Sequence, residues 1–356
     1  MLLLESLYQK TPQEKMKIKI QVTKQVHLNK SIQVFRGIAI IAVVVIHTIP
    51  GGEWQVFCRP FVNYAVAIFI FLSGYLTHEE NQWAPLLKKR ILRVLIPYCL
   101  WSIIYCLPLI IEGRVLSFFL RLITAQTCFP FYYIFVYVQF VILTPLLFKL
   151  LKSKYREIGW FVTPIYIIFS VYIPRLTHPF NPLVSVINID ICLGWFCFYY
   201  LGLILGNNNS LKGYYLSVYR FIQNKSLILY LSCYFVSILF QMVEIDFWFN
   251  YGVNNCGSQG NLSSIFSNLI FSIIVYKVII NKRHILGTRI LSIIGNYSFG
   301  IYMSHVLVIK ILNQSAIYHQ IPYIINSLLI VCISLIFCYI LSQILGVKYS
   351  HYLGLE

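Results

Sequence analysis

Residues 33–47 read QVFRGIAIIAVVVIH, an apolar run in which Arg36 and His47 are the only ionisable side chains. An ionisable residue inside a membrane span is costly and marks a functional site by default. On a helix, eleven steps of about 100° return to within roughly 20° of the start, so the two side chains share one face. At about 1.5 Å per residue, His47 lies roughly 16 Å farther along the axis than Arg36. We therefore expect a cation at one membrane surface and a titratable imidazole near the middle of the bilayer, which suits a long anionic substrate.

The composition is that of a polytopic membrane protein. Apolar residues make up 59% of the chain and charged residues 11%, against about 25% charged residues in a soluble domain. We expect an all-α fold of about ten transmembrane helices, because most of the apolar runs are near the ~20 residues that cross a bilayer. The predicted spans are residues 33–50, 61–78, 95–112, 131–150, 159–174, 189–206, 226–244, 262–280, 290–312 and 322–345.

The basic residues predict an orientation. With the N-terminus in the cytoplasm, cytoplasmic segments carry 23 of the 28 Lys and Arg residues, and the positive-inside rule then makes both termini cytoplasmic. The net charge of +17 is mostly this topology signal, and basic residues dispersed among membrane loops argue against a nucleic-acid partner. We find no secretory signal peptide. The Ile-, Tyr- and Asn-rich composition favours the inner (plasma) membrane of a bacterium.

The chain is organised as one membrane domain. We expect a cytoplasmic basic N-terminal tail over residues 1–30, a ten-helix domain over 31–346 and a short cytoplasmic C-terminal tail over 347–356. The stretches between spans are too short for an extramembrane catalytic domain, so any chemistry must use the helix bundle. Gly202 and Gly206 form a small-xxx-small pair suited to close helix packing, although glycine is also common in membrane helices without that role. No Cys or His spacing resembles a zinc site, so no metal is expected, and a homo-oligomer stays open.

A second group of polar residues lies in the ninth predicted span, SFGIYMSH (298–305). Ser298, Tyr302 and His305 are spaced i, i+4 and i+7, so they share one helix face. Two imidazoles at membrane depth, His47 and His305, favour a buried acid–base site. The alternative for each is a hydrogen-bonded packing residue.

A dense basic cluster precedes the third predicted span. Lys88, Lys89, Arg90 and Arg93 are typical of a topology anchor whose side chains reach lipid phosphates. Arg90 and Arg93 nevertheless share a helix face and offer forked donors that match phosphate oxygens. Together with Arg36 they predict a clamp for an anion at the cytoplasmic surface.

Weaker candidates lie nearer the expected outer face. Glu53 follows His47 closely, Gln139 lies in the fourth span, and Asp190 lies near the start of the sixth. Each could bind an acceptor substrate, as could Glu244 with Asp246 at the end of the seventh span. The acids are also typical of solvated interfacial residues, and Gln139 of a hydrogen bond between helices.

The segment RGIAIIAVVVIH resembles the opening signature of membrane acyltransferase family 3, an Arg, ten residues and then a His. Further motifs resemble this family in its order along the chain, from about residue 31 to 345. They are FIFLSGYL (69–76), KKRILRVLIPYCLWS (88–102), YYIFVYVQFVILTPLL (132–147), FYYLGLILG (198–206) and IGNYSFGIYMSH (294–305). The fourth span departs from the family in having Tyr132 and Tyr133 where a Trp is often seen.

The resemblance implies an enzyme that takes an acyl group, usually acetyl, from cytoplasmic acyl-CoA to a hydroxyl of a surface carbohydrate. The chain resembles the stand-alone members, without a fused esterase-like domain, that act on polysaccharides or lipid-linked sugars. Acyl-CoA has a polyanionic head, for which we expect Arg36, Lys89, Arg90 and Arg93 to supply the cationic partners.

The candidate catalytic roles follow from this chemistry. His47 is the expected general base for the attacking hydroxyl, since an imidazole pKa near ~6.5 suits proton transfer at neutral pH. His305 would orient His47, share its proton or hold the thioester carbonyl, and Ser298 and Tyr302 could donate hydrogen bonds to the developing oxyanion. An acyl-histidine or acyl-serine intermediate stays open.

Two other function classes compete with an acyltransferase. A transporter or flippase for a glycan or its lipid carrier also suits ten spans, but it predicts a polar lumen lined by several charged residues, of which the sequence offers few. A sensor or scaffold predicts that neither His is needed. Within the enzyme class, transfer to an amino group also stays open.

Overall fold

The computed structural model describes residues 12–177, 191–208, 210–281, 287–315 and 318–355. Within these ranges every regular element is a helix, so the all-α prediction is confirmed. The helices of the first half are α2 (Pro12–Thr48), α3 (Trp54–Cys58), η1 (Arg59–Phe61), α4 (Tyr64–Tyr75), α5 (Trp83–Tyr105), α6 (Leu107–Ile111), α7 (Val115–Ile123), η2 (Phe129–Phe131), α8 (Tyr132–Lys152), η3 (Arg156–Trp160), α9 (Val162–Ile167), η4 (Ile168–Tyr172) and α10 (Ile173–Thr177). The second half contains η5 (Cys192–Trp195), α12 (Phe196–Gly206), α13 (Lys212–Gln223), α14 (Leu227–Asn250), α15 (Leu262–Ile280), α16 (Thr288–Asn296), α17 (Ser298–Leu312), η6 (Tyr318–Gln320), α18 (Tyr323–Ser350) and η7 (His351–Leu353).

Several of these helices can cross a membrane. Among the described residues, six meet the length and composition of a span, and the bent pair α16 and α17 makes seven. The remaining predicted spans correspond to α5 and to two shorter apolar helices, Val162–Thr177 and Cys192–Gly206. The protein is therefore a multi-pass membrane protein, while the number ten and the cytoplasmic position of both termini stay predictions. α5 begins at Trp83, so the basic cluster lies on this helix and not before it.

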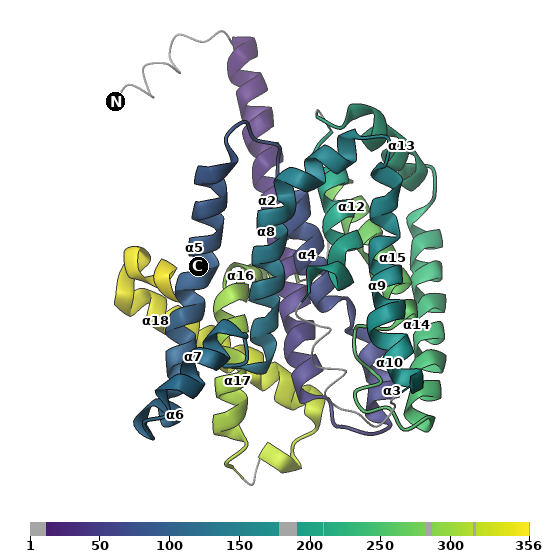
Figure 1. Ribbon diagram of the computed structural model, residues 1–356. Coiled ribbons are helices and arrows are strands. Elements are labelled where there is room, and N and C mark those ends of the chain that lie inside the picture. Colours follow the sequence, from purple (N-terminus) through teal and green to yellow (C-terminus); the bar gives the residue numbers. More distant parts are fainter. Residues whose placement is uncertain (1–11, 178–190, 209, 282–286, 316–317, 356) are drawn as a thin grey trace.

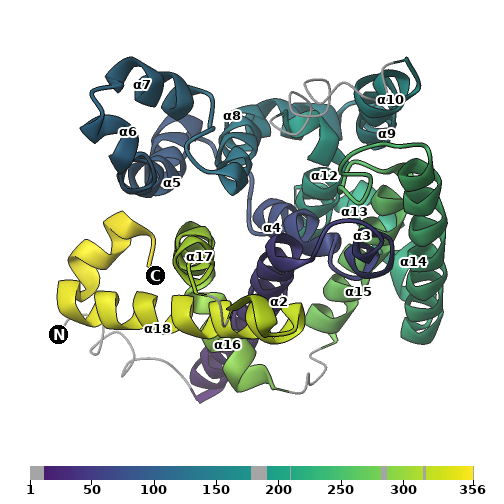
Figure 2. The ribbon, with the colours of Figure 1, turned by 90° about the horizontal axis from the view of Figure 1, so that it is seen from below.

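Helix α2 is the central element of the bundle (Figures 1 and 2). It packs against α4 and α15 on one side and against α16, α17 and α18 on the other. The two main apolar cores both include residues of α2 and α8. A side chain on α2 that faces α8 therefore lies where these two apolar cores meet.

Both ends of the chain differ from simple tails. Residues 12–30, for which the sequence predicts a tail, continue α2 and project beyond the bundle in Figure 1. At the other end, Leu355 is buried, and Trp101 Nε1 donates to the Leu353 carbonyl oxygen at 3.2 Å. The last described residues therefore pack against α5.

Close packing of α4 against α12 depends on the predicted glycine pair. A Cβ at Gly202 would lie 2.3 Å from the Phe71 carbonyl oxygen, and one at Gly206 would lie 2.1 Å from that of Tyr75. No real Cβ makes such a contact, so only glycine lets the two backbones approach this closely. The small-xxx-small interpretation is confirmed.

The predicted ninth span, 290–312, is not one straight helix. α16 and α17 are bent by 77° at Tyr297. A Cβ at Gly295 would lie 1.8 Å from the Gln33 carbonyl oxygen, so α16 lies directly on the backbone of α2. We attribute the bend to this contact, because α16 follows α2 while α17 turns away to pack beside α18.

Candidate functional site

His47 and His305 come together across the interface of α2 and α17. Their ring centroids are 5.3 Å apart with planes inclined by 41°, and the Phe129 ring stands edge-on to His47 at 5.9 Å. His47 lies in the last turn of α2, whose candidate span ends at Thr48. His47 therefore lies at the end of its helix, just before Pro50 and the glycines that follow it, and the depth of the imidazole in the bilayer stays a prediction.

The backbone on both sides of His47 is held by other elements. Arg59 Nη1 donates to the Ile46 carbonyl oxygen at 3.1 Å, and its Nε donates to the Gly257 carbonyl oxygen at 3.0 Å. The Thr48 hydroxyl lies 2.5 Å from the Ser327 hydroxyl of α18. These contacts fix the otherwise unpaired end of α2 and so orient the imidazole.

His305 is fully buried, and its hydrogen bonds define its tautomer. Nδ1 lies 3.1 Å from the Ile301 carbonyl oxygen and 2.8 Å from the Tyr302 carbonyl oxygen. Because both partners can only accept, Nδ1 carries the proton. Nε2 is buried and has no hydrogen-bond partner among the described residues, so a neutral His305 presents a lone pair there.

Ser298 and Tyr302 share the buried face of α17 with His305, as their spacing predicts. The Tyr302 hydroxyl donates to the Pro130 carbonyl oxygen, which ties α17 to η2. Ser298 Oγ is buried and lacks a hydrogen-bond partner in the described part of the chain. Seven residues at about 1.5 Å place it about 10 Å along the axis from His305, so the structure does not bring Ser298 to the imidazole pair.

A cationic cluster lies farther back along α2, toward the other end of the bundle. The Arg36 guanidinium interacts electrostatically with Arg93 of α5 and with the phenols of Tyr133 and Tyr137 on α8. Tyr137 also interacts with Arg90 and Arg93. Arg36 and His47 therefore both face the α8 side, as the helical spacing predicts.

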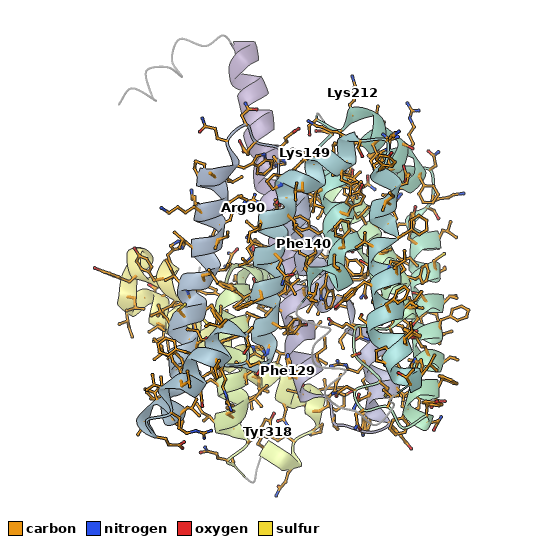
Figure 3. All side chains as sticks on the ribbon, in the orientation of Figure 1. Arg90, Phe129, Phe140, Lys149, Lys212 and Tyr318 are labelled. Carbon is orange, nitrogen blue, oxygen red and sulfur yellow. The ribbon has the colours of Figure 1, made fainter. Side chains whose placement is uncertain are left out.

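The members of this cluster differ in exposure. Arg36 and Arg90 are half-buried, whereas Lys89 and Arg93 are exposed, and Arg90 Nη1 donates to the Thr77 hydroxyl at 2.7 Å. The ion pairs found among the described residues involve other side chains. Three guanidinium groups without a carboxylate partner among the described residues give this part of the bundle a net positive charge. Figure 3 shows Arg90 near the same end of the bundle as Lys149 and Lys212, with Phe129 toward the opposite end.

The weaker candidates are dispersed. Glu53 is exposed at the start of α3. Gln139 Oε1 accepts a hydrogen bond from the Cys192 backbone amide at 3.1 Å, so it joins α8 to η5. Asp190 lies outside the described residues.

No metal centre is found in the described part of the chain, where no three His, Cys, Asp or Glu side chains are grouped to hold an ion.

The fold and the site define a multi-pass helical membrane protein with an imidazole pair, of which His305 is buried and His47 half-buried, and a separate cationic cluster. Comparison with models of protein families matches residues 29–343 to the acyltransferase 3 model, described as an acyltransferase domain. Because the match covers nearly the whole chain, the protein belongs to the acyltransferase 3 family and is an acyltransferase. The corresponding comparisons with curated proteins and with solved structures give no match.

Sequence reasoning missed Arg59, Tyr137 and the Thr48–Ser327 contact. In the sequence, Arg59 is indistinguishable from an ordinary basic residue at the outer face. Tyr137 is indistinguishable from the many aromatic residues that pack between helices. Their partners are remote in sequence or are backbone atoms, so no local signal indicates them. The four-residue spacing of Tyr133 and Tyr137 on α8 is the only sequence feature that could have placed both phenols on one face.

Proposed function

We propose that the protein transfers an acetyl or similar short acyl group from acyl-CoA to a hydroxyl of a cell-surface polysaccharide or lipid-linked sugar, with His47 as general base. The observation that carries this proposal is the His47–His305 pair, in which a buried nitrogen lone pair lies beside a second imidazole. An acyl transfer to a hydroxyl needs such a base, because the hydroxyl must lose its proton as it attacks.

The cationic cluster is the proposed donor site. Acyl-CoA carries several phosphate charges, and Arg36, Arg90 and Arg93 offer forked donors to phosphate oxygens. Exposed Lys89 adds a mobile positive charge at its edge. From Arg36, the α2 axis leads over about 16 Å to His47, so a donor anchored at the cluster extends its thioester toward the imidazole pair.

The tautomer of His305 assigns the proton roles. A centroid distance of 5.3 Å permits one nitrogen of each ring to approach to about 3 Å, within hydrogen-bond range. In that arrangement His305 Nε2 accepts a hydrogen bond from one nitrogen of His47 and orients the ring, while the other nitrogen of His47 takes the hydroxyl proton, as in a catalytic triad. Neutral His305 has no free donor, so it does not hold the thioester carbonyl.

The proposed reaction moves the acyl group from the CoA sulfur to the acceptor oxygen. The acceptor O–H loses its proton to His47, the oxygen attacks the thioester carbon, the C–S bond breaks, and the CoA thiolate takes the proton back. Direct attack and an acyl-histidine relay both start from the same imidazole. The resemblance to the acyltransferase 3 family supports the carbohydrate acceptor, and the composition supports the bacterial inner membrane.

Acetyl-CoA labelled in the acetyl group tests the proposal. Purified folded protein in detergent is incubated with the labelled thioester, and free acetate, exchange and transferred label are measured. We expect consumption that depends on His47. A folded protein that consumes none would contradict the proposal and favour the transporter.

A further inference from the structure

A polar surface lies at the end of the bundle where α10 and α14 end and α15 begins (Figure 1). We call it the Trp248 surface, and it consists of Tyr172, Arg175, Trp248, Gln259 and Ser263. Trp248 is buried, while the other four side chains are half-buried. The surface thus consists of a buried aromatic ring surrounded by half-buried polar side chains.

Arg175 is held at this surface by two neutral side chains. Its Nη1 donates to Asn261 Oδ1 at 2.7 Å and its Nη2 to the Ser258 hydroxyl at 3.4 Å. The guanidinium lies over the Trp248 ring at 5.2 Å. None of the ion pairs found in the described ranges includes Arg175.

The scaffold around the surface satisfies its own polar groups. Glu244 accepts hydrogen bonds from the Tyr172 hydroxyl and from the Ser263 backbone amide, and the Leu262 amide donates to the Tyr172 oxygen at 3.0 Å. Glu244 and Tyr172 therefore cap the first turn of α15. The carboxylate is occupied by this structural role, so we do not include it among the binding groups.

Three polar atoms at the surface have no such partner. Trp248 Nε1, Gln259 Oε1 and Ser263 Oγ are buried and make no hydrogen bond to any described residue. Each unsatisfied buried polar atom costs about 1–3 kcal/mol, and native proteins contain few of them. Gln259 is adjacent in sequence to Ser258, which Arg175 binds, and Ser263 follows Leu262, whose amide binds Tyr172. One donor, one acceptor and one hydroxyl in these segments complement the hydroxyls of a sugar.

We propose that the Trp248 surface binds the carbohydrate acceptor. This inference rests on the proposed function. Trp248 Nε1 donates to one sugar oxygen, Gln259 Oε1 and Ser263 Oγ accept from sugar hydroxyls, and Arg175 donates to a further oxygen. An aromatic belt at the membrane surface explains exposed rings, but it does not explain buried polar atoms without partners.

A series of hydrogen bonds and backbone links joins this surface to the backbone beside His47. Arg175 holds Asn261, whose Nδ2 donates to the Cys256 carbonyl oxygen at 2.9 Å. The adjacent Gly257 carbonyl oxygen accepts from Arg59, which also holds the carbonyl of Ile46 next to His47. An acceptor bound here therefore lies on the His47 side of the bundle, away from the proposed donor site.

Removing the unpartnered atoms tests the proposal without breaking existing hydrogen bonds. Ser263→Ala and Trp248→Phe delete Ser263 Oγ and Trp248 Nε1, and Ser334→Ala deletes an equally buried, unpartnered hydroxyl in α18 as the matched control. Membranes of cells that make each variant are given acetyl-labelled acetyl-CoA, and alkali-labile label in the extracted envelope carbohydrate is counted. Purified variants are assayed in parallel for CoA binding and acetyl-CoA hydrolysis.

We expect carbohydrate labelling to fall about three- to tenfold for each surface variant, the factor of one hydrogen bond. Hydrolysis and CoA affinity stay at the wild-type level, and Ser334→Ala labels like wild type. If Ser263→Ala and Trp248→Phe label carbohydrate like wild type, the Trp248 surface is not the acceptor site, although the proposed function stands. If the wild-type protein neither hydrolyses acetyl-CoA nor labels carbohydrate, the proposed function fails and the acceptor site fails with it. Hydrolysis without carbohydrate labelling contradicts the carbohydrate acceptor and therefore this site.

Discussion

His305 presents its unpartnered Nε2 within a ring that lies 5.3 Å from the ring of His47, centroid to centroid. The two helices that carry these residues come from opposite ends of the sequence and meet at the imidazoles. The carbonyl oxygens of Ile301 and Tyr302 hold the Nδ1 proton of His305. This fixed tautomer makes His305 Nε2 a hydrogen-bond acceptor available to His47.

Replacing His305 with Asn separates its two nitrogens. Asn keeps an N–H donor near the position of Nδ1 but has no atom at the position of Nε2. We expect His305→Asn to lower acetyl-CoA turnover by about 10²-fold or more, with a melting temperature closer to wild type than that of His305→Ala. Wild-type turnover in His305→Asn would show that Nε2 takes no part.

Removing the Arg36 charge should weaken donor binding. Arg36 is half-buried among Tyr133, Tyr137 and Arg93, and a hydrogen bond to a charged group contributes about 1.5–3 kcal/mol. We expect Arg36→Gln to weaken CoA binding by about tenfold or more in a calorimetric titration, with a smaller effect at high salt. Arg220→Gln removes an exposed guanidinium from α13 and should leave the affinity unchanged. Equal affinities for wild type and Arg36→Gln would place the CoA head elsewhere.

The Tyr302 hydroxyl already has a partner, which makes its role testable. Because it donates to the Pro130 carbonyl oxygen, Tyr302→Phe leaves a buried carbonyl unsatisfied at a cost of about 1–3 kcal/mol of folding stability. We expect a lower melting temperature and less than about a tenfold loss of turnover. A loss of 10²–10³-fold, the effect of removing an oxyanion donor, with unchanged stability would instead show that this hydroxyl stabilises the transition state.

Replacing glycine by alanine should change the stability of the protein differently at two positions in the neighbouring helices α12 and α13. A Cβ at Gly202 would lie 2.3 Å from the Phe71 carbonyl oxygen, whereas one at Gly213 in α13 meets nothing within 4 Å. We expect Gly202→Ala to destabilise the protein by about 1–3 kcal/mol through forced separation of α4 and α12. Gly213→Ala should be neutral or stabilise by up to about 1 kcal/mol. Thermal unfolding in detergent checks both, and unchanged stability in Gly202→Ala would argue against the close α4–α12 contact.

The features predicted from the sequence are those that local periodicity determines. The shared face of Arg36 and His47, the buried stripe of Ser298, Tyr302 and His305, and the Gly202–Gly206 contact all follow from the 3.6-residue period of a helix. The all-α fold follows from apolar composition. The family follows from motifs that occur in order along the chain.

Features that depend on long-range packing could not be predicted in this way. The bend at Tyr297 comes from the contact of Gly295 with the backbone at Gln33, and no proline marks it. Arg59 acts through the carbonyl oxygens of Ile46 and Gly257, which any residue type supplies. Only the folded chain shows that the Tyr302 hydroxyl is already engaged.

The central claim is that the His47 imidazole performs the chemistry while the arginine cluster holds the donor. Acetyl-CoA turnover and CoA affinity, measured on the same purified His47→Ala protein, test both parts. We predict that turnover falls by at least about 10²-fold while the CoA dissociation constant stays within about twofold of wild type. Full turnover in folded His47→Ala would contradict the account.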